Sequence, residues 1–339
     1  MLEYRGSFKS HLSSCICRNL LTVWEIMARK KVLIIAGPTA SGKSDLALEV
    51  AEEFGGVVIN ADSMQIYQGL EVVTASPKKN ARSRVPHRLY GVCDPAISFS
   101  AGQWVGLAKQ EIQAAHQAGF LPIVVGGTGM YLQTLMRGIA AMPAVPAAIR
   151  EDVRSRLSDK GSVILHAELS KVDPKTAARL HVSDGQRIAR AIEIYEATGK
   201  TLAQWHAVEI ESEISPEFKF RSVLLRPRRE LLYAACDVRF EEMLRTGALD
   251  EVAALVDRKL DPNLPAMKAL GIPAIIKYLA GELLFKDAVS AGQQTTRHYV
   301  KRQGTWFRNQ FIADMIIESQ YNNTLNPKIF SFISKFILT

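Results

Sequence analysis

A glycine-rich octapeptide, GPTASGKS, occupies residues 37–44 and directly follows the apolar run Val32–Ala36. It matches the G-x-x-x-x-G-K-[ST] pattern of a loop that joins a β-strand to a helix. Gly37 and Gly42 let the backbone curl so that successive N–H groups face one concavity, and a helix beginning at Lys43 adds the positive end of its dipole. The strand before the loop and the helical stretch after it disfavour a chance match. The octapeptide therefore predicts a binding site for a di- or triphosphate.

Composition places few limits beyond those of an ordinary globular protein. The 339 residues are 47% apolar, enough to bury the core of one large α/β domain with an insertion, or of two domains. The net charge of +8 permits a polyanionic partner such as nucleic acid without requiring one. The four cysteines are too scattered for a zinc site and too few for a disulfide scaffold, which favours reduced thiols and a cytoplasmic protein. The apolar stretch Leu20–Trp24 is far shorter than a bilayer span, so no membrane segment is expected.

Short apolar runs alternate with amphipathic stretches over much of the chain. Strands are predicted at Val32–Ala36, Val57–Asn60 and Phe120–Val125, with a helix over residues 101–118 before the last of them. A further strand is expected at Phe220–Leu225. Strands that alternate with helices form a parallel sheet covered on both faces. The predicted fold is therefore α/β: a P-loop NTPase-like parallel sheet flanked by helices, with an inserted helical subdomain.

Changes in composition divide the chain into segments. Residues 1–28 show no period that links them to the rest of the chain, and we expect a loose N-terminal extension or an unused upstream start; a mitochondrial presequence is the alternative, disfavoured by Glu3 and Glu25. Residues 142–206 are helical in pattern and rich in charge, which predicts the inserted helical domain. The catalytic core would then comprise residues 29–141 and 207–312, the latter including C-terminal helices. Residues 313–339 are expected to form a C-terminal tail.

Polar residues follow the predicted strands where the carboxyl ends of a parallel sheet meet, so Gly37, Asp62 and the segment 126–128 should share one rim. Nucleotide-hydrolysing enzymes usually end a second apolar strand in an acidic, metal-holding residue, whereas the strand here ends in Gly-Gly-Thr. This weakens the interpretation as an ATPase. Asp62 could hold a metal through water or accept a proton from a nucleophile. The alternative for Asp62, and equally for Thr128, is a capping role at a turn or helix start.

Several further segments resemble, in order and spacing, the tRNA dimethylallyltransferases, also called tRNA isopentenyltransferases. The resemblance covers about residues 31–310 and is far more specific than the loop alone. The segments are NADSMQIYQGL, PHRLYGVCDP, SAGQW, PIVVGGTGMYLQTLMRG, DGQRIARAIEIYEATGK, LPAMKALGIPAI and TTRHYVKRQGTWFRNQ. The chain departs from the family at Val73–Pro77, where many members read GTAKP, which puts any substrate contact by Ser76 in doubt. It has no C-terminal zinc-finger motif, which favours a bacterial-type member.

The resemblance implies an activity and its partners. Members transfer a dimethylallyl group from dimethylallyl diphosphate to N6 of adenosine 37, next to the anticodon of tRNA, giving N6-(dimethylallyl)adenosine and diphosphate. The expected partners are therefore tRNA and dimethylallyl diphosphate, the expected cofactor is Mg²⁺, and the expected state is a monomer. No nucleoside triphosphate is consumed, so the phosphate in the loop belongs to the leaving group.

The resemblance also implies roles for individual residues, matched motif by motif. The catalytic residues would be Asp62, which accepts the N6 proton, Thr128 near the departing oxygen, and Lys43. The diphosphate would be held by Gly37, Pro38, Thr39, Ala40, Ser41, Gly42, Lys43 and Ser44, with Ser44 also near Mg²⁺ and Arg229 adding a further charge. The residues that meet tRNA would be Asp62, Ser63, Met64, Gln65, Thr128, Arg150, Gln186, Arg187, Ile188, Ala189 and Arg190. For Arg187 and Arg190 a solvated basic stripe is the alternative.

Three other functions stay open on the sequence. A prenyl transferase acting on free adenine nucleotides shares the chemistry, although the insertion and the positive charge favour the larger polyanion. A small-metabolite kinase shares the loop, although the acidic strand end is missing. A non-catalytic RNA-binding protein is disfavoured because Lys43, Ser44, Asp62 and Thr128 are all present.

Overall fold

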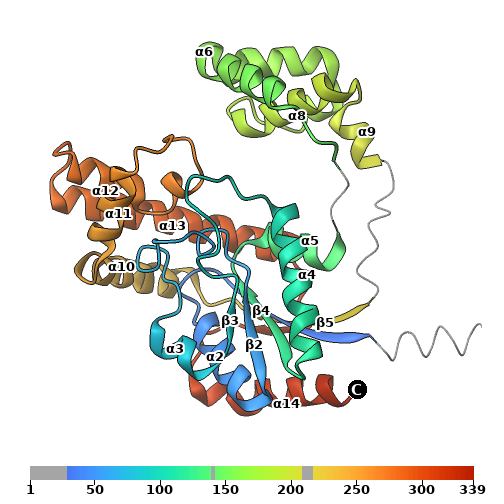
Figure 1. The fold of residues 1–339 in the computed structure, drawn as a ribbon, viewed down its shortest axis with the longest axis vertical. Helices are drawn as coiled ribbons and strands as arrows, with labels where there is room; N and C mark the ends of the chain where they lie inside the picture. The colour runs from blue at the N-terminus through green and yellow to red at the C-terminus, as the bar shows by residue number, and fades with distance from the viewer. Residues whose placement is uncertain (1–28, 139–141, 208–216) are drawn as a thin grey trace, which may run out of the picture. The chain divides into compact units, whose positions relative to one another are not determined.

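A computed structural model describes residues 29–138, 142–207 and 217–339, so the expected N-terminal extension lies outside the described residues. The chain forms two compact units, drawn in Figure 1. Unit 1 contains the residues up to 136 and those from 215 to 339, and unit 2 contains residues 137–214. The helical insertion predicted at 142–206 falls within unit 2.

Unit 1 is built on a six-stranded sheet in which every neighbouring pair is parallel, in the order β3-β2-β4-β1-β5-β6. The central strand β1 pairs with β4 through Ile34 and Val124, and with β5 through Ile34 and Ser222. This confirms the predicted α/β fold. The strands are β1 (Lys30–Ala36), β2 (Gly56–Asn60), β3 (His87–Arg88), β4 (Leu121–Gly126), β5 (Phe218–Leu225) and β6 (Met315–Ile317).

The central strands are continuous apolar runs because both of their faces are covered. Leu33 and Ile35 of β1 lie in one core cluster with α2 (Lys43–Phe54) and α14 (Asn326–Leu338). Val32 and Ile34 point to the other cluster, which contains Trp104 and Ile112 of α4 (Ala101–Gln117). Alternate residues of one strand thus pack on opposite layers. Figure 1 shows α2 and α14 close together on one side of the strands.

The remaining helices of unit 1 follow β2, β4 and β5. In the C-terminal part, α10 and α12 both pack on α13, the longest of these helices. These helices are α3 (Lys79–Arg84), α5 (Gly129–Arg137), α10 (Arg229–Arg245), α11 (Ala248–Asp257), α12 (Ile272–Leu279) and α13 (Phe285–Gln310). None of the helices within the described ranges is both long and apolar enough to cross a membrane.

Residues 313–339, expected to form a C-terminal tail, contribute a strand and a helix to the core of unit 1. β6 pairs with β5, with Leu224 opposite Ile316, and α14 buries Ile329, Ile333 and Phe336. The strand was missed because three residues are too few to show a period-two pattern. The helix did carry a signal, since its three buried residues recur at the i, i+4, i+7 spacing of an apolar helical stripe.

Unit 2 is a small helical body with its own core. It contains α6 (Ala147–Val172), α7 (Pro174–Ala177), α8 (Gly185–Thr198) and α9 (Leu202–Ala207). Gly161 has a φ of 79° and breaks α6 into two helical arms. Val153 and Leu165 from the two arms pack with Ile188 and Ile192 of α8. The core of this unit thus joins residues that lie close together in the sequence.

Candidate functional site

The phosphate loop lies between β1 and α2, and its backbone turns sharply at two positions. Ala40 and Gly42 have φ values of 62° and 87°, in the left-handed region that only glycine adopts without penalty. At Gly37 a Cβ would lie 2.7 Å from Ser41 Oγ and 2.8 Å from the carbonyl oxygen of Leu225, so only glycine fits. A backbone that alternates between right-handed and left-handed conformations in this way turns consecutive N–H groups toward one side. The loop is therefore preformed as an anion-binding concavity.

Lys43 opens α2 and lies half-buried at the base of the loop. Its Nζ donates to the carbonyl oxygen of Pro38 at 3.4 Å. Burial, opposed by the charge of Asp62 and aided by the guanidinium of Arg239, lowers the pKa of Lys43 from 10.5 to about 8. A bound phosphate would place a negative charge beside this ammonium and so favour its charged form.

Arg239 contacts the phosphate loop from a distant helix. It comes from the middle of α10, and its Nη2 donates to Thr39 Oγ1. Burial lowers the pKa of its guanidinium, while Cys236 and Asp62 act in the opposite direction. Nothing in the sequence singles it out, because acidic residues on both sides make it look like an ordinary partner in a surface ion pair.

Arg229, the residue predicted to add charge at the diphosphate, begins α10, about 15 Å from Arg239 along the helix axis at 1.5 Å per residue. It lines a different concavity together with Pro38, Arg226 and Arg228. The role predicted for Arg229 stays a prediction, and the structure brings a further arginine, Arg239, to the loop.

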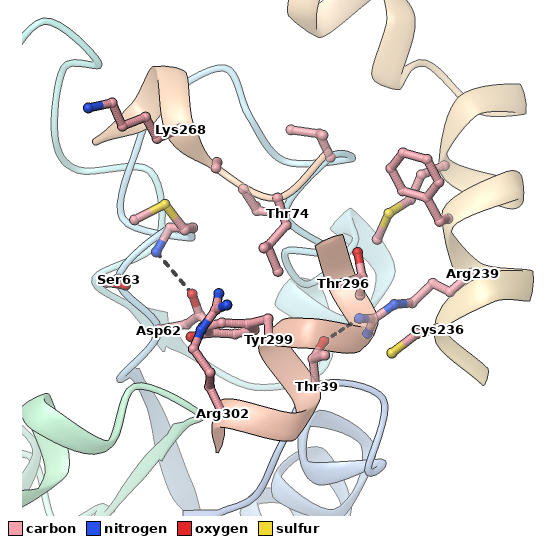
Figure 2. Close-up of a pocket in the computed structure, with 16 residues that line it drawn as sticks. Thr39, Asp62, Ser63, Thr74, Cys236, Arg239, Lys268, Thr296, Tyr299 and Arg302 are labelled. Atoms are coloured by element: carbon pink, nitrogen blue, oxygen red, sulfur yellow. Dashed lines mark hydrogen bonds between the residues drawn. The ribbon is translucent and has the colours of Figure 1, made fainter. Parts of the chain in front are cut away.

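Asp62 follows β2, where its backbone is fixed by the buried side chain of Asn60. The N–H of Asp62 donates to Asn60 Oδ1 at 2.8 Å, and Asp62 Oδ1 accepts from the N–H of Met64 at 2.9 Å. One carboxylate oxygen thus caps the turn, as the alternative interpretation of the sequence had it. Asp62 also lines a cavity with Tyr299 and Arg302, as Figure 2 shows. The capping role and a role in the cavity are compatible.

Thr128 joins the loops that follow β2 and β4. Its Oγ1 accepts from the N–H of Ser63 at 2.9 Å, and its own N–H donates to the carbonyl oxygen of Ala61 at 3.3 Å. At Gly126 a Cβ would lie 2.1 Å from the carbonyl oxygen of Ala61, so glycine is needed where the two loops cross. The structure therefore places Thr128 beside the segment that carries Asp62.

Gln303 of α13 connects two of these loops and was missed in the sequence. Its Oε1 accepts from the N–H of Thr39 at 2.9 Å, and its Nε2 donates to the carbonyl oxygen of Gly127 at 2.9 Å. Tyr299, one turn earlier, has a pKa raised by burial and by the charge of Asp62. Nothing in the local sequence distinguishes this glutamine from an ordinary core contact of a helix.

The cavity beside Asp62 has a volume of about 210 Å³ and combines polar with apolar walls. Thr39, Asp62 and Arg239 supply polar groups, and Figure 2 shows Thr39 and Arg239 meeting through their hydrogen bond. Its apolar lining consists of Met64, Val73, Phe240, Met243 and Leu270. Such a space suits a ligand that joins an anionic head to a short hydrocarbon group.

Other predicted residues of unit 1 have structural contacts. Gln65 Nε2 donates to the carbonyl oxygens of Thr74 and Ala75, both at 2.9 Å, and so braces the loop that departs from the family pattern. Ser44 is exposed and shares a concavity with Lys43, Asp45 and Arg239. Within the described ranges no cluster of three His, Cys, Asp or Glu side chains could enclose a metal ion. A Mg²⁺ ion held mainly by phosphate oxygens needs only one or two protein oxygens, which the Ser44 hydroxyl and the Asp45 carboxylate fit.

The predicted tRNA-binding residues of unit 2 differ in exposure. Gln186 and Arg187 of α8 are exposed, and Arg187 Nη1 lies 3.5 Å from Asp184 Oδ2. Arg190 is half-buried, with its Nη1 3.2 Å from Glu193 Oε2, and Arg150 Nη2 donates to the carbonyl oxygen of Val145 at 3.4 Å. Of these four side chains, those of Gln186 and Arg187 are the most exposed.

Ile188 and Ala189, also predicted to meet tRNA, are correctly placed on α8 but point inward. Ile188 is 0% exposed and Ala189 is 4% exposed, both within the core of unit 2. Their side chains therefore cannot contact an RNA. The sequence interpretation included them because it took five consecutive helical residues together, whereas helical geometry turns only some of them outward.

The fold and the rim are those of a P-loop protein whose cavity suits a phosphorylated, partly apolar ligand. The sequence profile of the family described as IPP transferase matches residues 65–310, and the chain belongs to that family. The chain is 53% identical over 285 residues to the tRNA dimethylallyltransferase of Rhodopseudomonas palustris BisB18, covering 84% of this chain and 90% of the relative. It is also 53% identical to the enzyme of that name from a Bradyrhizobium strain, over 83% of this chain and 92% of the relative.

Two solved structures share the fold. The tRNA isopentenylpyrophosphate transferase of Bacillus halodurans matches with a TM-score of 0.65 at 29% identity, over 91% of this chain and 97% of its own. A eukaryotic dimethylallyltransferase, captured acting on tRNA, matches with a TM-score of 0.76 at 28% identity, over 91% of this chain and 79% of its own. The family predicted from the sequence motifs is thereby confirmed.

Proposed function

We propose that this protein transfers the dimethylallyl group of dimethylallyl diphosphate to N6 of adenosine 37 in tRNA, releasing diphosphate. The observation that carries the proposal is that Thr39 of the phosphate loop and Asp62 line one half-apolar cavity, with Thr128 hydrogen-bonded to the neighbouring Ser63, in a chain of the IPP transferase family. In this reaction the N6–C bond forms, the bond from carbon to the bridging oxygen breaks, and one N6 proton leaves.

The diphosphate head would occupy the concavity of the phosphate loop. Backbone N–H groups, Lys43 and Arg239 would face the oxygen on which charge grows as the bond to carbon breaks. These charges are already partly desolvated, so little reorganisation is needed when the leaving group departs. A divalent cation, Mg²⁺ by its preference for oxygen, would neutralise the diphosphate from the side of Ser44 and Asp45.

Asp62 would act as the proton acceptor. The exocyclic amine of adenine is a poor nucleophile because its lone pair is delocalised into the ring, so a positioned base is needed as the bond to carbon forms. The turn that fixes Asp62 leaves its second oxygen available in the cavity. Thr128, held against Ser63, would orient the same loop toward the departing oxygen.

The adenosine must leave its stack to reach this cavity, as bases do in enzymes that modify them. Arg302, Lys268 and Tyr299 lie around the cavity and offer charge and an aromatic ring to a nucleic acid. Gln186, Arg187, Arg190 and Arg150 of unit 2 remain proposed tRNA contacts. The monomeric state and the cytoplasmic location likewise remain proposals.

The function is tested by incubating purified protein with Mg²⁺, dimethylallyl diphosphate and tRNA from a strain that lacks the modification. Mass spectrometry of the digested nucleosides should show N6-(dimethylallyl)adenosine. Parallel reactions with AMP as acceptor, and with ATP in place of the allylic donor, separate the two other enzyme functions. Modification of AMP in preference to tRNA, or phosphoryl transfer from ATP, would reject the proposal.

A further inference from the structure

The C-terminal segment lies directly against the outside of the phosphate loop. Gln320 Nε2 donates to the carbonyl oxygen of Ala40 at 3.1 Å, and the N–H of Tyr321 donates to the carbonyl oxygen of Ser41 at 3.1 Å. These contacts link residues that are 280 positions apart in the chain. Gln320 and Tyr321 lie beyond residue 310, where the match to the family profile ends.

The two carbonyl groups that receive these hydrogen bonds belong to the strained part of the loop. Ala40 has a φ of 62°, a left-handed conformation that a residue with a Cβ adopts only when its surroundings hold it there. A loop that turns its N–H groups inward must turn these carbonyl groups outward, where they need donors of their own. Gln320 and Tyr321 supply one donor each.

Tyr321 also closes the loop sterically. A Cβ at Gly42 would lie 2.8 Å from Tyr321 Cβ and 3.2 Å from Tyr321 N, so the two backbones touch. The tyrosine is itself fixed, because its hydroxyl donates to Asn326 Oδ1 at 2.6 Å and its ring packs on the core cluster shared by α2 and α14. The segment is thus held between β6 and α14 and cannot move away without breaking these contacts.

We propose that Gln320 and Tyr321 are positioning residues for the phosphate loop. They keep the carbonyl groups of Ala40 and Ser41 turned outward and thereby keep the N–H groups of the loop turned toward the diphosphate. The proposal rests on the proposed function, since it assigns these residues to the same diphosphate site. The chemical class of the ligand is an inorganic or organic diphosphate with its divalent cation.

The test measures binding of inorganic diphosphate with Mg²⁺ by isothermal titration calorimetry to the full-length protein. Gln320→Ala and Gln320→Met both remove the donor, and the methionine keeps most of the packing. One lost hydrogen bond should raise Kd about 2- to 12-fold. Gln310→Ala, at an exposed glutamine ending α13, is the matched control and should bind as the wild type does.

Kinetics separate positioning from general structural support. For both Gln320 variants, KM for dimethylallyl diphosphate should rise by a factor similar to that in Kd, while KM for tRNA and Tm stay at the wild-type values. If the Gln320 variants bind diphosphate as tightly as Gln310→Ala does, this inference is overturned and the proposed function still stands. A joint shift of both KM values and Tm would also overturn it, since that result indicates only a folding role. A wild-type protein that binds no diphosphate would overturn the proposed function as well.

Discussion

The rim of unit 1 and the helical unit 2 are built in opposite ways. At the rim, Thr39 meets Gln303 and Arg239, and Ala40 meets Gln320, so contacts join segments that are 200 or more residues apart. In unit 2 the core joins α6 and α8, which are separated in the sequence only by the short helix α7. The proposed donor site therefore depends on the assembled fold, whereas the surface of unit 2 depends on a local helical body. Substitutions in the two regions should separate chemistry from tRNA binding.

The largest expected effect is at Asp62. Asp62→Asn keeps an oxygen that can accept from the N–H of Met64 but removes the proton acceptor. We expect kcat to fall about 10²- to 10⁴-fold, the usual contribution of a general base, with Kd for tRNA nearly unchanged. Single-turnover kinetics and tRNA gel-shift titrations measure the two quantities. A large loss of tRNA binding with kcat preserved would contradict the role of Asp62.

The next prediction compares variants of two arginines on one helix. Arg239→Met removes the charge that contacts Thr39, and we expect kcat/KM for dimethylallyl diphosphate to fall about 10²- to 10³-fold. Arg229→Met, at the exposed start of α10, should change it within about 2- to 3-fold. Steady-state rates at saturating tRNA decide between them. If Arg229 holds the diphosphate, as its motif suggested, the order of the two effects will be reversed.

The lowered pKa of Lys43 predicts a pH dependence of donor binding. At pH values above about 8, Lys43 of the free protein is neutral. Binding of the diphosphate favours the charged form, so Lys43 takes up a proton when the ligand binds. Diphosphate affinity should therefore fall about tenfold per pH unit above that value. The charged form is disfavoured in the folded protein, so the contribution of this group to stability rises as the pH increases from about 8 to 10.5.

Titration calorimetry in buffers of different ionisation enthalpy detects the proton uptake. Lys43→Arg keeps a charge that does not titrate in this range, and it corrects for the ionisation of the diphosphate itself. Equal pH profiles for the two proteins would exclude Lys43 as the titrating group.

The smallest expected effect on catalysis is in unit 2. Arg187→Ala removes an exposed charge, so KM for tRNA should rise a few-fold, the salt dependence of tRNA binding should weaken by about one phosphate contact, and kcat should not change. Fluorescence titrations over a range of salt concentrations measure this. A fall in kcat with unchanged tRNA affinity would contradict the proposed division of roles, in which unit 1 carries the chemistry and unit 2 binds tRNA.

Ile188→Ala provides the structural contrast on the same helix. Ile188 is fully buried, so its truncation should destabilise unit 2 by about 2–5 kcal/mol without removing any RNA-facing group. Limited proteolysis of unit 2 should then accelerate for Ile188→Ala and not for Arg187→Ala.

The local features of this protein could be predicted from its sequence. The spacing of GPTASGKS after an apolar run predicts the strand, the loop and the helix, because each depends on residues that are adjacent in the chain. The periodicity of the apolar runs likewise predicted four of the six strands and the parallel sheet, since a strand buried on both faces is apolar throughout. The family motifs added the expected activity.

The distant side chains that complete the site became evident from the tertiary structure alone. Arg239 and Gln303 occupy ordinary helical positions in the sequence, and nothing nearby indicates that they reach Thr39. The same holds for Gln320 and Tyr321, whose partners lie near the opposite end of the chain. The inward orientation of the Ile188 and Ala189 side chains likewise became evident only from the helix packing of unit 2. Contacts of this kind depend on how the helices pack across the sheet, and no local pattern records that packing.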